Sequence, residues 1–500
     1  MGSKLEKYNP LIKTALDKAK ENDVYAILRL QDYKNINVSV LNGKTESKAI
    51  SPIKGIGISV FTKDGATGFA STSRLDEENV KQAVDVAANL AKSSAKYEGV
   101  KRNTEIFNVE SLKGEYLQST KYTLNSKTSD EIEKIVQDFN KNTKTLDERL
   151  SVNSSYSCVE EEWRIARTDG TDVTFNIPTS RLMTFVTLKE DGKIAEAYFK
   201  THGIDLGVIL DEDSKHNFGK KEKSTVSLVS NLLNAGVMTG GHYKALLSYA
   251  FVGLNAHEAV GHAFETDGFK DSIVAINGKL RKGEKVAPEN ITFIDGPLEG
   301  TWGNQFISHN GVKRKTVEFI KNGVIVDALS DVFSAKEAGV EINGCGRAQT
   351  YSKQPICRMT ITRMVDNNPY PFDKTSLEDV TLDEIYDTLI KHDELKPGEQ
   401  IVYPVIGMGG QVNPAEGRFV FNCAGIYVIE NPKKITLYKQ SIFSGDIMGA
   451  IKTKAKGIGP VAVGDTGTCG KMHQGASVSD GGNLFMILDK TEDITFGGQQ

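Results

Sequence analysis

The chain has 500 residues, of which 39% are hydrophobic and 25% charged, a composition typical of a soluble globular protein with at least two domains. Its net charge of -4 lacks the basic excess of a nucleic-acid-binding protein, and no apolar run approaches the ~20 residues that span a membrane. There is no N-terminal signal pattern, and five cysteines do not suggest a disulfide framework. We therefore expect a cytoplasmic protein that binds neither nucleic acid nor membranes.

Helical and strand-like patterns alternate over the first 150 residues. Helices are predicted over 5–22, after a cap at Ser73 and after Ser129, with strands at 24–30, 36–41 and 55–61. The pair Asn42-Gly43 is typical of the tight turn of a β-hairpin. This alternation predicts an α/β layer in which helices cover a sheet.

Long hairpins are predicted after residue 150, with turns at Asp169-Gly170 and Asp191-Gly192. The charged run 211–223 is predicted to be solvated surface or a linker, and a short helix is expected over 225–234. We place a domain boundary there. The N-terminal domain, with helices on a sheet and long hairpins, would cover 1–225, and a second domain would cover 226–500.

The second half is predicted to be rich in short β-strands. A strand is expected at 243–249, directly before a helical segment, and another helix at 376–392 has Thr381 and Glu384 as a capping box. The whole chain is thus predicted to be α+β. An N-terminal α/β domain would be followed by a β-rich C-terminal domain whose first helix carries metal-binding residues.

These residues are His257, Glu258 and His262. Neutral imidazoles suit zinc, and a neighbouring carboxylate can take a proton from a metal-bound water. The histidines are five residues apart, so at ~100° per residue a regular helix would point them about 140° apart. We expect the helix to break or change pitch at Gly261. A competing interpretation is that Asn255 and Glu258 only form a capping box.

A third metal ligand must come from elsewhere in the chain. Glu265, Asp267 and the cysteines are the candidates, and Cys469 stands out because it lies in a glycine-rich segment predicted to be an exposed loop. Lys471, two residues on, would favour its thiolate form. Cys158 and Cys423 are interpreted as buried core residues.

The glycine-rich segment 407–412 allows two interpretations. It could be a flexible turn between strands, or its backbone, including Gly409, Gly410, Gln411 and Val412, could bind an extended peptide by strand addition. Residues 419–428 would then form the neighbouring strand.

Several motifs resemble the TldD/PmbA family of zinc metallopeptidases, on the TldD side that bears HExxxH. The motifs are HEAVGHAFETD, TGTCGK, GMGGQVNPAEGRFVF, NGCGRAQTY and GIGISVFTKDGATGFAST, which together extend over nearly the whole chain. The resemblance implies a zinc ion held by His257, His262 and Cys469, with Glu258 as general base. It also implies unfolded or short peptides as substrates, and a homodimer or a heterodimer with a TldE-like partner that lacks the metal motif. The sequence departs from the family pattern at 308–311 (Ser-His-Asn-Gly), at Ile361 and at His473, which bears on substrate choice.

Three functions are compatible with these residues. The first is a zinc peptidase in which Glu258 activates a metal-bound water and Tyr351, Arg347 or His473 stabilises the oxyanion. The second is a non-catalytic peptide-binding or regulatory subunit with a structural metal site. The third is a metal-dependent hydrolase of esters or cyclic amides.

Overall fold

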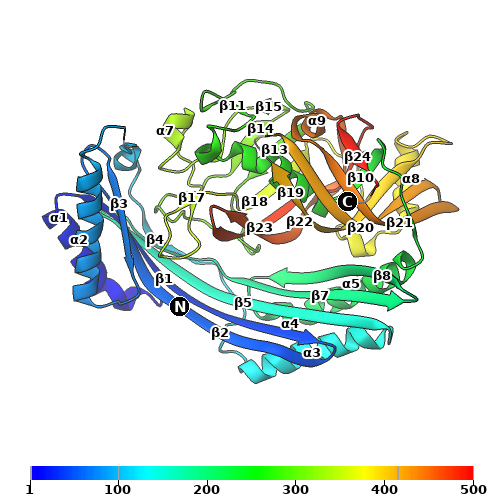
Figure 1. Ribbon diagram of the computed structural model, residues 1–500, viewed down its shortest axis with the longest axis horizontal. Coiled ribbons are helices and arrows are strands. Elements are labelled where there is room, and N and C mark those ends of the chain that lie inside the picture. Colours follow the sequence, from blue (N-terminus) through cyan, green and yellow to red (C-terminus); the bar gives the residue numbers. More distant parts are fainter. Residues whose placement is uncertain (1–2, 100, 414–415, 499–500) are drawn as a thin grey trace.

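The computed structural model describes residues 3–99, 101–413 and 416–498, which form two large sheets with helices around them (Figure 1). The described strands of the N-terminal sheet are β1 (Tyr25–Leu41), β2 (Lys44–Phe61), β3 (Thr67–Thr72), β4 (Lys113–Tyr116), β5 (Leu150–Arg167), β6 (Asp172–Asn176), β7 (Thr179–Glu190) and β8 (Lys193–Gly203). Those of the C-terminal sheet are β9 (Gly236–Val237), β10 (Lys244–Ser248), β13 (Ile291–Asp295), β14 (Val317–Lys321), β15 (Val324–Ile325), β18 (Ile361–Asp366), β19 (Ile401–Asn413), β20 (Arg418–Asn431), β21 (Lys434–Asp446), β22 (Ala455–Lys471), β23 (Gln474–Leu488) and β24 (Ile494–Phe496). The predicted α+β fold class is confirmed.

The remaining elements are helices and two small hairpins. The hairpins are β11 (Ala275–Ile276) with β12 (Lys279–Leu280), and β16 (Gly346–Arg347) with β17 (Ile356–Cys357). The α-helices are α1 (Asn9–Glu21), α2 (Glu77–Ser94), α3 (Ser129–Thr145), α4 (Gly207–Leu210), α5 (Glu212–Leu232), α6 (Tyr249–Leu254), α7 (Ala335–Ala338), α8 (Leu382–Lys391) and α9 (Ile447–Lys452). Short 3-10 or π segments are η1 (Glu6–Tyr8), η2 (Glu105–Asn108), η3 (Asn255–Val260), η4 (Gly261–Phe264), η5 (Thr266–Gly268) and η6 (Leu377–Asp379). Within the described part of the chain, none of the helices combines the length and apolarity that a membrane crossing requires.

Long antiparallel strands build the N-terminal sheet. β1 pairs with β2 on one side and with β5 on the other, and the predicted turn at Asn42-Gly43 has positive φ at both residues. The two strands predicted at 24–30 and 36–41 are one continuous strand. Helices α1 and α2 cover one end of this sheet and α3 covers the other (Figure 1).

Capping explains where two of these helices begin. The predicted cap Ser73 is wrong: α2 begins after Asp76, whose side chain accepts a hydrogen bond from the Asn79 N–H. Asp76 is the N-cap because it immediately precedes the first helical residue. At that position its carboxylate lies beside the free N–H groups of the first turn. Thr128 and Glu131 form a capping box at the start of α3, and the predicted box of Thr381 and Glu384 is confirmed in α8.

The charged run 211–223 is not a linker. It forms the first half of α5, which buries Phe218 and Val226 against the β7–β8 region while its charged side chains mostly face solvent. A helix tolerates this composition because its apolar residues lie on one stripe. The domain boundary expected at residue 225 falls inside α5 and stays a prediction.

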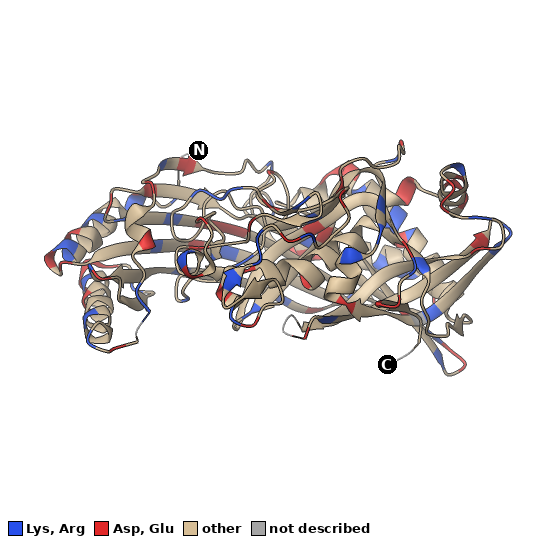
Figure 2. Ribbon diagram, turned by 90° about the horizontal axis from the view of Figure 1, so that it is seen from above, with Lys and Arg blue, Asp and Glu red and all other residues tan. Residues whose placement is uncertain are grey.

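Long hairpins, rather than the predicted short strands, form much of the C-terminal sheet. β19, β20 and β21 make a meander of 13- and 14-residue strands, and β22 and β23 form a second hairpin. A shared hydrophobic cluster joins the N-terminal sheet to the segment between β13 and β14: Trp163, Ile165 and Phe175 pack with Ile307 and Val312. Positively and negatively charged residues are interspersed along the chain (Figure 2).

A buried ion pair holds the centre of the C-terminal sheet. Arg314 and Asp295 are both fully buried, and the Arg314 guanidinium donates a hydrogen bond to the Asp295 carboxylate. Asp295 also accepts hydrogen bonds from Thr360 N–H at 2.9 Å and from the Thr362 hydroxyl at 3.0 Å. This network fixes the start of β18 against the end of β13.

We predict that Asp295→Ala lowers the free energy of unfolding by about 3–5 kcal/mol, because it leaves the Arg314 charge buried without its partner. The measurement is the urea midpoint of the variant. The double variant Asp295→Ala/Arg314→Met is the matched control and should lose less stability than the single variant. A single variant within about 1 kcal/mol of the native chain would contradict this account.

Candidate metal centre

The helix that carries His257 and His262 changes pitch between these two residues. Strand β10 leads directly into α6, which continues as the π-helix η3 and the 3-10 helix η4. The Gly261 N–H donates to the Ala256 carbonyl, five residues earlier. A π turn brings residues five apart onto one face. The rings of His257 and His262 therefore lie beside each other, with centroids 5.1 Å apart and planes at 88°.

The predicted change of pitch at Gly261 is present, because the π-helix η3 ends at Val260 and the 3-10 helix η4 begins at Gly261. Its φ of -58° is ordinary helical backbone, so the change does not use the conformational freedom of glycine. A Cβ at this position would lie 2.1 Å from Met359 Sδ, and glycine is needed for that close approach. The capping-box interpretation is also wrong, because the helix begins at Tyr249 and Asn255 lies within it.

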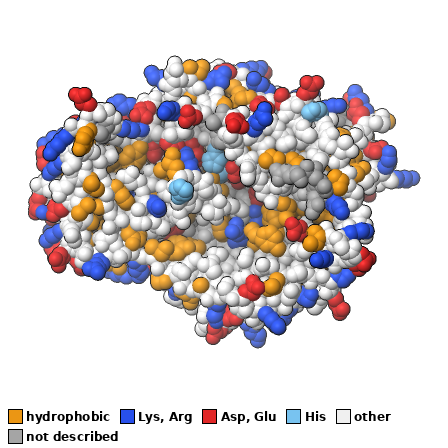
Figure 3. All heavy atoms as spheres, viewed as in Figure 1, with side chains coloured by type: hydrophobic (Ala, Val, Ile, Leu, Met, Phe, Trp, Pro, Cys, Tyr) orange, Lys and Arg blue, Asp and Glu red, His pale blue; other side chains and the backbone are white. Residues whose placement is uncertain are grey.

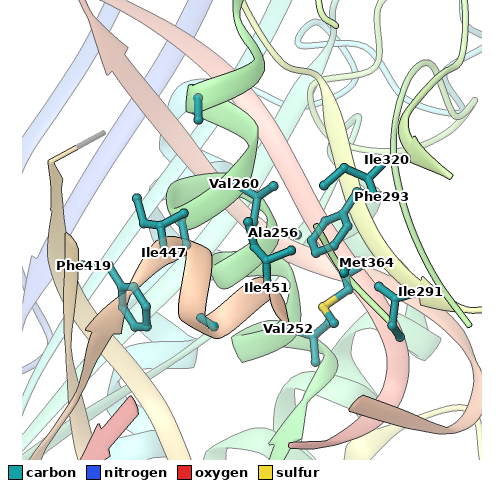
Figure 4. Packing of buried hydrophobic residues seen from close by; sticks show 14 of the residues in the cluster. Val252, Ala256, Val260, Ile291, Phe293, Ile320, Met364, Phe419, Ile447 and Ile451 are labelled. Atoms are coloured by element: carbon teal, nitrogen blue, oxygen red, sulfur yellow. The ribbon is translucent and has the colours of Figure 1, made fainter. Parts of the chain in front are cut away.

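The opposite face of this helix is anchored in the largest hydrophobic cluster of the protein's described residues. Val252, Ala256 and Val260 are buried and point toward neighbouring apolar side chains (Figure 4). These neighbours include Ile447 and Ile451 of α9 on one side, and Phe293, Ile320 and Met364 on the other. The packing fixes the direction in which the two imidazoles point.

Cys469 lies next to the histidines, on a strand rather than on the predicted exposed loop. It belongs to β22, is 6% exposed, and places its Sγ 3.2 Å from His262 Nε2. The glycine-rich sequence forms a strand because β23 pairs with it throughout this region. Buried Arg358 donates hydrogen bonds to the carbonyls of Cys469 and Gln474, and so fixes the tip of the hairpin.

Hydrogen bonds on the far side of each ring aim both imidazoles at the sulfur. His257 Nδ1 lies 2.9 Å from an Asp480 carboxylate oxygen, and His262 Nδ1 lies 2.9 Å from Glu265. Each Nε2 therefore faces inward, and the donor atoms of His257, His262 and Cys469 all lie within 4.8 Å of one another. His257 Nε2 is buried without a hydrogen-bond partner among the described residues. An imidazole held by a carboxylate, with its other nitrogen free, is the arrangement that metal-binding histidines require.

The charges in the cluster favour a thiolate. Burial raises the pKa of the Cys469 thiol, but the positive charges and hydrogen bonds of His257 and His262 outweigh it and lower the pKa to about 5. Lys471 does not supply this effect as predicted. Its ammonium lies 2.8 Å from Glu265 and 2.5 Å from Asp267. These carboxylates are thereby engaged by Lys471, and the geometry favours Cys469 over both as a third ligand.

Glu258 borders a cavity of about 380 Å³ on the open side of the cluster. Its side chain is 34% exposed, and one carboxylate oxygen lies 3.8 Å from His262 Nε2. Val412 and Asn413 of β19 line the same cavity. On the face shown in Figure 3, acidic, basic and apolar side chains lie interspersed. Substrate and solvent could reach the carboxylate through this cavity.

The glycine-rich segment is part of a strand, so its interpretation as a flexible turn is wrong. Gly409, Gly410, Gln411 and Val412 belong to β19, which pairs with β20 through a register shift between Gly407 and Gly410. The prediction that residues 419–428 form the neighbouring strand is confirmed. Cys158 and Cys423 are buried core residues, as predicted.

None of the predicted oxyanion residues lines the cavity beside Glu258 in the described structure. Arg347 is buried and donates to the Met359 carbonyl, Tyr351 packs beside Gly55 of the N-terminal sheet, and His473 lies in the turn between β22 and β23.

The three departures from the family pattern also lie outside the cavity beside Glu258. Residues 308–311 form a buried turn near Ile165, and Ile361 is buried in β18.

Sequence reasoning missed two residues that shape the site. Asp480 orients His257 from 223 residues away, and Arg358 holds the Cys469 strand through backbone carbonyls. Neither shows a local signal, because their roles arise only when β23 lies beside the histidine-bearing helix and Arg358 lies beside β22.

Comparison with known proteins identifies the class of this fold and site. Residues 240–463 match the PmbA/TldA metallopeptidase C-terminal domain, and residues 26–91 match the PmbA/TldA metallopeptidase domain 1. The first of these matches includes the histidine-bearing helix, so the fold and the site are those of a metallopeptidase family. The chain belongs to the PmbA/TldD family.

Individual relatives agree with this assignment. Metalloprotease MJ0996 of Methanocaldococcus jannaschii is 27% identical over 95% of this chain and 98% of its own length. The zinc metalloprotease TldD homolog of Saccharolobus solfataricus is 24% identical over 61% of this chain and 62% of its own length. Among solved structures, TldE from Thermococcus kodakarensis has a TM-score of 0.71 at 15% identity, covering 97% of this chain and 99% of that one. That likeness shows the shared fold.

We predict that Asp480→Asn weakens zinc binding by about 10- to 100-fold, because the amide no longer holds His257 as a charged acceptor does. Competition with a chelator of known affinity measures the effect. Asp271→Asn is the matched control, since Asp271 lines the cavity beside Glu258 without contacting either imidazole. Equal zinc affinities for the two variants would contradict the role given to Asp480.

Proposed function

We propose that this chain is a zinc-dependent, TldD-type peptidase that cleaves unfolded or short peptides. One observation carries the proposal: His257 Nε2, His262 Nε2 and Cys469 Sγ converge beside the accessible carboxylate of Glu258. Two neutral imidazoles and a thiolate are a donor set that suits zinc. Three protein donors also leave a coordination position open, as in catalytic zinc sites.

Zinc at this position would polarise the scissile carbonyl and acidify a water molecule. Glu258 would accept the proton from that water and return it to the leaving amine. Asp480 and Glu265 hold His257 and His262 in the tautomer that directs each Nε2 inward. Burial of His257, Cys469 and Glu265 keeps water away from the protein side of the site.

We further propose that the peptide lies along the free edge of β19. Among the described residues this strand pairs with β10 only at Ile401 and Val402, while Gly410 to Val412 pair with β20 on the other edge and Gly409 lies in the register shift. An extended peptide could add to the remaining edge through main-chain hydrogen bonds, a mode that tolerates many sequences. Val412 lines the cavity beside Glu258, so such a peptide would pass the proposed general base.

The assembly and the compartment are part of the proposal. The likeness of fold to TldE supports pairing with a second copy or with a TldE-like chain that lacks the metal motif. All five cysteines are free and buried, which suits a reducing cytoplasm.

The alternative function is that of a non-catalytic subunit with a structural metal. The open coordination position and the exposed Glu258 favour the enzyme.

We predict that Glu258→Gln keeps its zinc and loses peptide cleavage by about 100-fold or more, because the amide cannot accept the proton. Zinc content and cleavage of an unfolded protein such as reduced casein are measured together. Glu318→Gln, a surface change on β14, is the control and should cleave at the native rate. Zinc-loaded native protein that cleaves no peptide, alone or with a TldE-like partner, would support the non-catalytic alternative. Cleavage of esters only would point to a different hydrolase.

We predict that Cys469→Ser loses most of its zinc, because serine does not replace a thiolate ligand at neutral pH. Elemental analysis of the purified variant and the native chain measures the loss. Cys423→Ser is the control, since Cys423 is buried outside the cluster. Full zinc occupancy in Cys469→Ser would contradict the ligand set and assign the third position to Glu265 or Asp267.

A further inference from the structure

A second cavity, of about 540 Å³, lies between the N-terminal sheet and the histidine-bearing helix. We call it the aromatic cavity. Its aromatic lining residues are Tyr198, Phe199, Tyr249, Phe251, Tyr403 and Tyr427. Its volume lies within the range of small-molecule binding sites, and it is larger than the cavity beside Glu258.

The same three elements line the aromatic cavity and then the cavity beside Glu258. The helix contributes Leu254 to the first and Glu258 to the second. β19 contributes Gly409 and then Val412, and β22 contributes Thr466 and then Gly470, in the same order. The two cavities therefore follow one another along the same three elements, each of which forms a wall of both.

The spacing along those walls gives the distance between the cavities. Glu258 lies four positions after Leu254 on the helix, a rise of about 6 Å. Val412 lies three positions after Gly409 on its strand, a span of about 10 Å, and Gly470 lies four positions after Thr466, a span of about 13 Å. An extended peptide advances about 3.3 Å per residue. The near edges of the two cavities are thus two to four peptide residues apart.

The wall formed by β19 leaves room for a chain to pass. Gly407 and Gly409 carry no side chains, and a Cβ placed on Gly409 would meet no atom within 4 Å. Beyond Val402, the edge of β19 away from β20 has no strand partner among the described residues. A peptide bound to this edge could therefore extend from Glu258 into the aromatic cavity without displacing part of the sheet.

Resting on the proposed peptidase function, we propose that the aromatic cavity is a specificity subsite. It receives one large aromatic side chain of the peptide substrate, two to four residues from the cleaved bond. Aromatic rings fit this lining because ring pairs gain energy beyond the area that they bury. Main-chain pairing with β19 accepts any sequence, whereas this cavity selects one residue.

The test uses a set of peptides of small residues that carry a single Phe at successive positions. Cleavage by the native protein should rise about tenfold or more in kcat/KM when Phe stands two to four residues from the cleaved bond, and not at other positions. A benefit that is equal at all positions, or absent, would overturn the proposal.

A matched pair of variants on α5 assigns the effect to the cavity. Ser224 is exposed at the aromatic cavity, so Ser224→Trp would place a ring in its opening. Ser227 is exposed on the same helix and lies outside the lining. The ratio of kcat/KM for the Phe peptide to that for the unsubstituted peptide should fall to near one in Ser224→Trp and stay native in Ser227→Trp. An unchanged ratio in Ser224→Trp would overturn the proposal.

A binding measurement separates this inference from the peptidase proposal. If no peptide is cleaved, the peptidase proposal fails, and the subsite is tested by binding of fluorescent peptides to Glu258→Gln. Tighter binding of one Phe peptide than of the unsubstituted peptide, lost in Glu258→Gln/Ser224→Trp and kept in Glu258→Gln/Ser227→Trp, would support the subsite. Equal binding of all peptides would overturn it.

Discussion

Two imidazoles five residues apart can face one point only if the helix between them is wound as a π turn, and the rest of the site depends on that turn. Such turns are rare and are found mostly at functional sites. Here the turn is held from behind by Val252, Ala256 and Val260, which are buried in the main hydrophobic cluster. Met359 packs against Gly261 at the C-terminal end of the π turn. The core thus stabilises a local geometry that the backbone alone would not favour.

The spacing of the histidines made the need for a change in pitch near Gly261 predictable, but not the length of chain over which it extends. The angle per residue in a helix is fixed, so the 140° mismatch follows from counting residues. Gly261 was the expected point of change because glycine is permissive. In the structure the segment Asn255–Val260 is wound as a π-helix, and the winding changes to 3-10 at Gly261, which itself keeps ordinary helical angles. Glycine is needed here because Met359 packs against this position. Met359 lies 98 residues away in the sequence, so the sequence around Gly261 gives no sign of this contact.

Cys469 shows a similar division between what was predictable and what was not. Its candidacy came from its unusual sequence neighbourhood, and the structure places its sulfur at the histidines. The predicted loop is a strand, because pairing with β23 outweighs the weak strand preference of glycine. The predicted influence of Lys471 failed because Glu265 and Asp267 compete for its ammonium. Local charge arguments could not foresee that competition, since these residues are about 200 positions apart.

The N-terminal half was predictable where patterns are local. Hairpin turns and the helices α2 and α3 are set by neighbouring residues and agree with the structure, although α2 begins after Asp76 rather than at a Ser73 cap. The charged start of α5 was expected as solvated surface or a linker. It is a surface helix, and its helical form was missed because the few apolar residues that anchor it are separated by long polar stretches.

His262 and Cys469 meet across 207 residues of chain. An ion shared by them would therefore act as a cross-link that closes a very long loop and ties the β22–β23 hairpin to the helix. Closing a loop of that length removes considerable freedom from the unfolded chain. Because ligand binding to the native state alone shifts the folding equilibrium, metal supply would influence the lifetime of the folded protein as well as its chemistry.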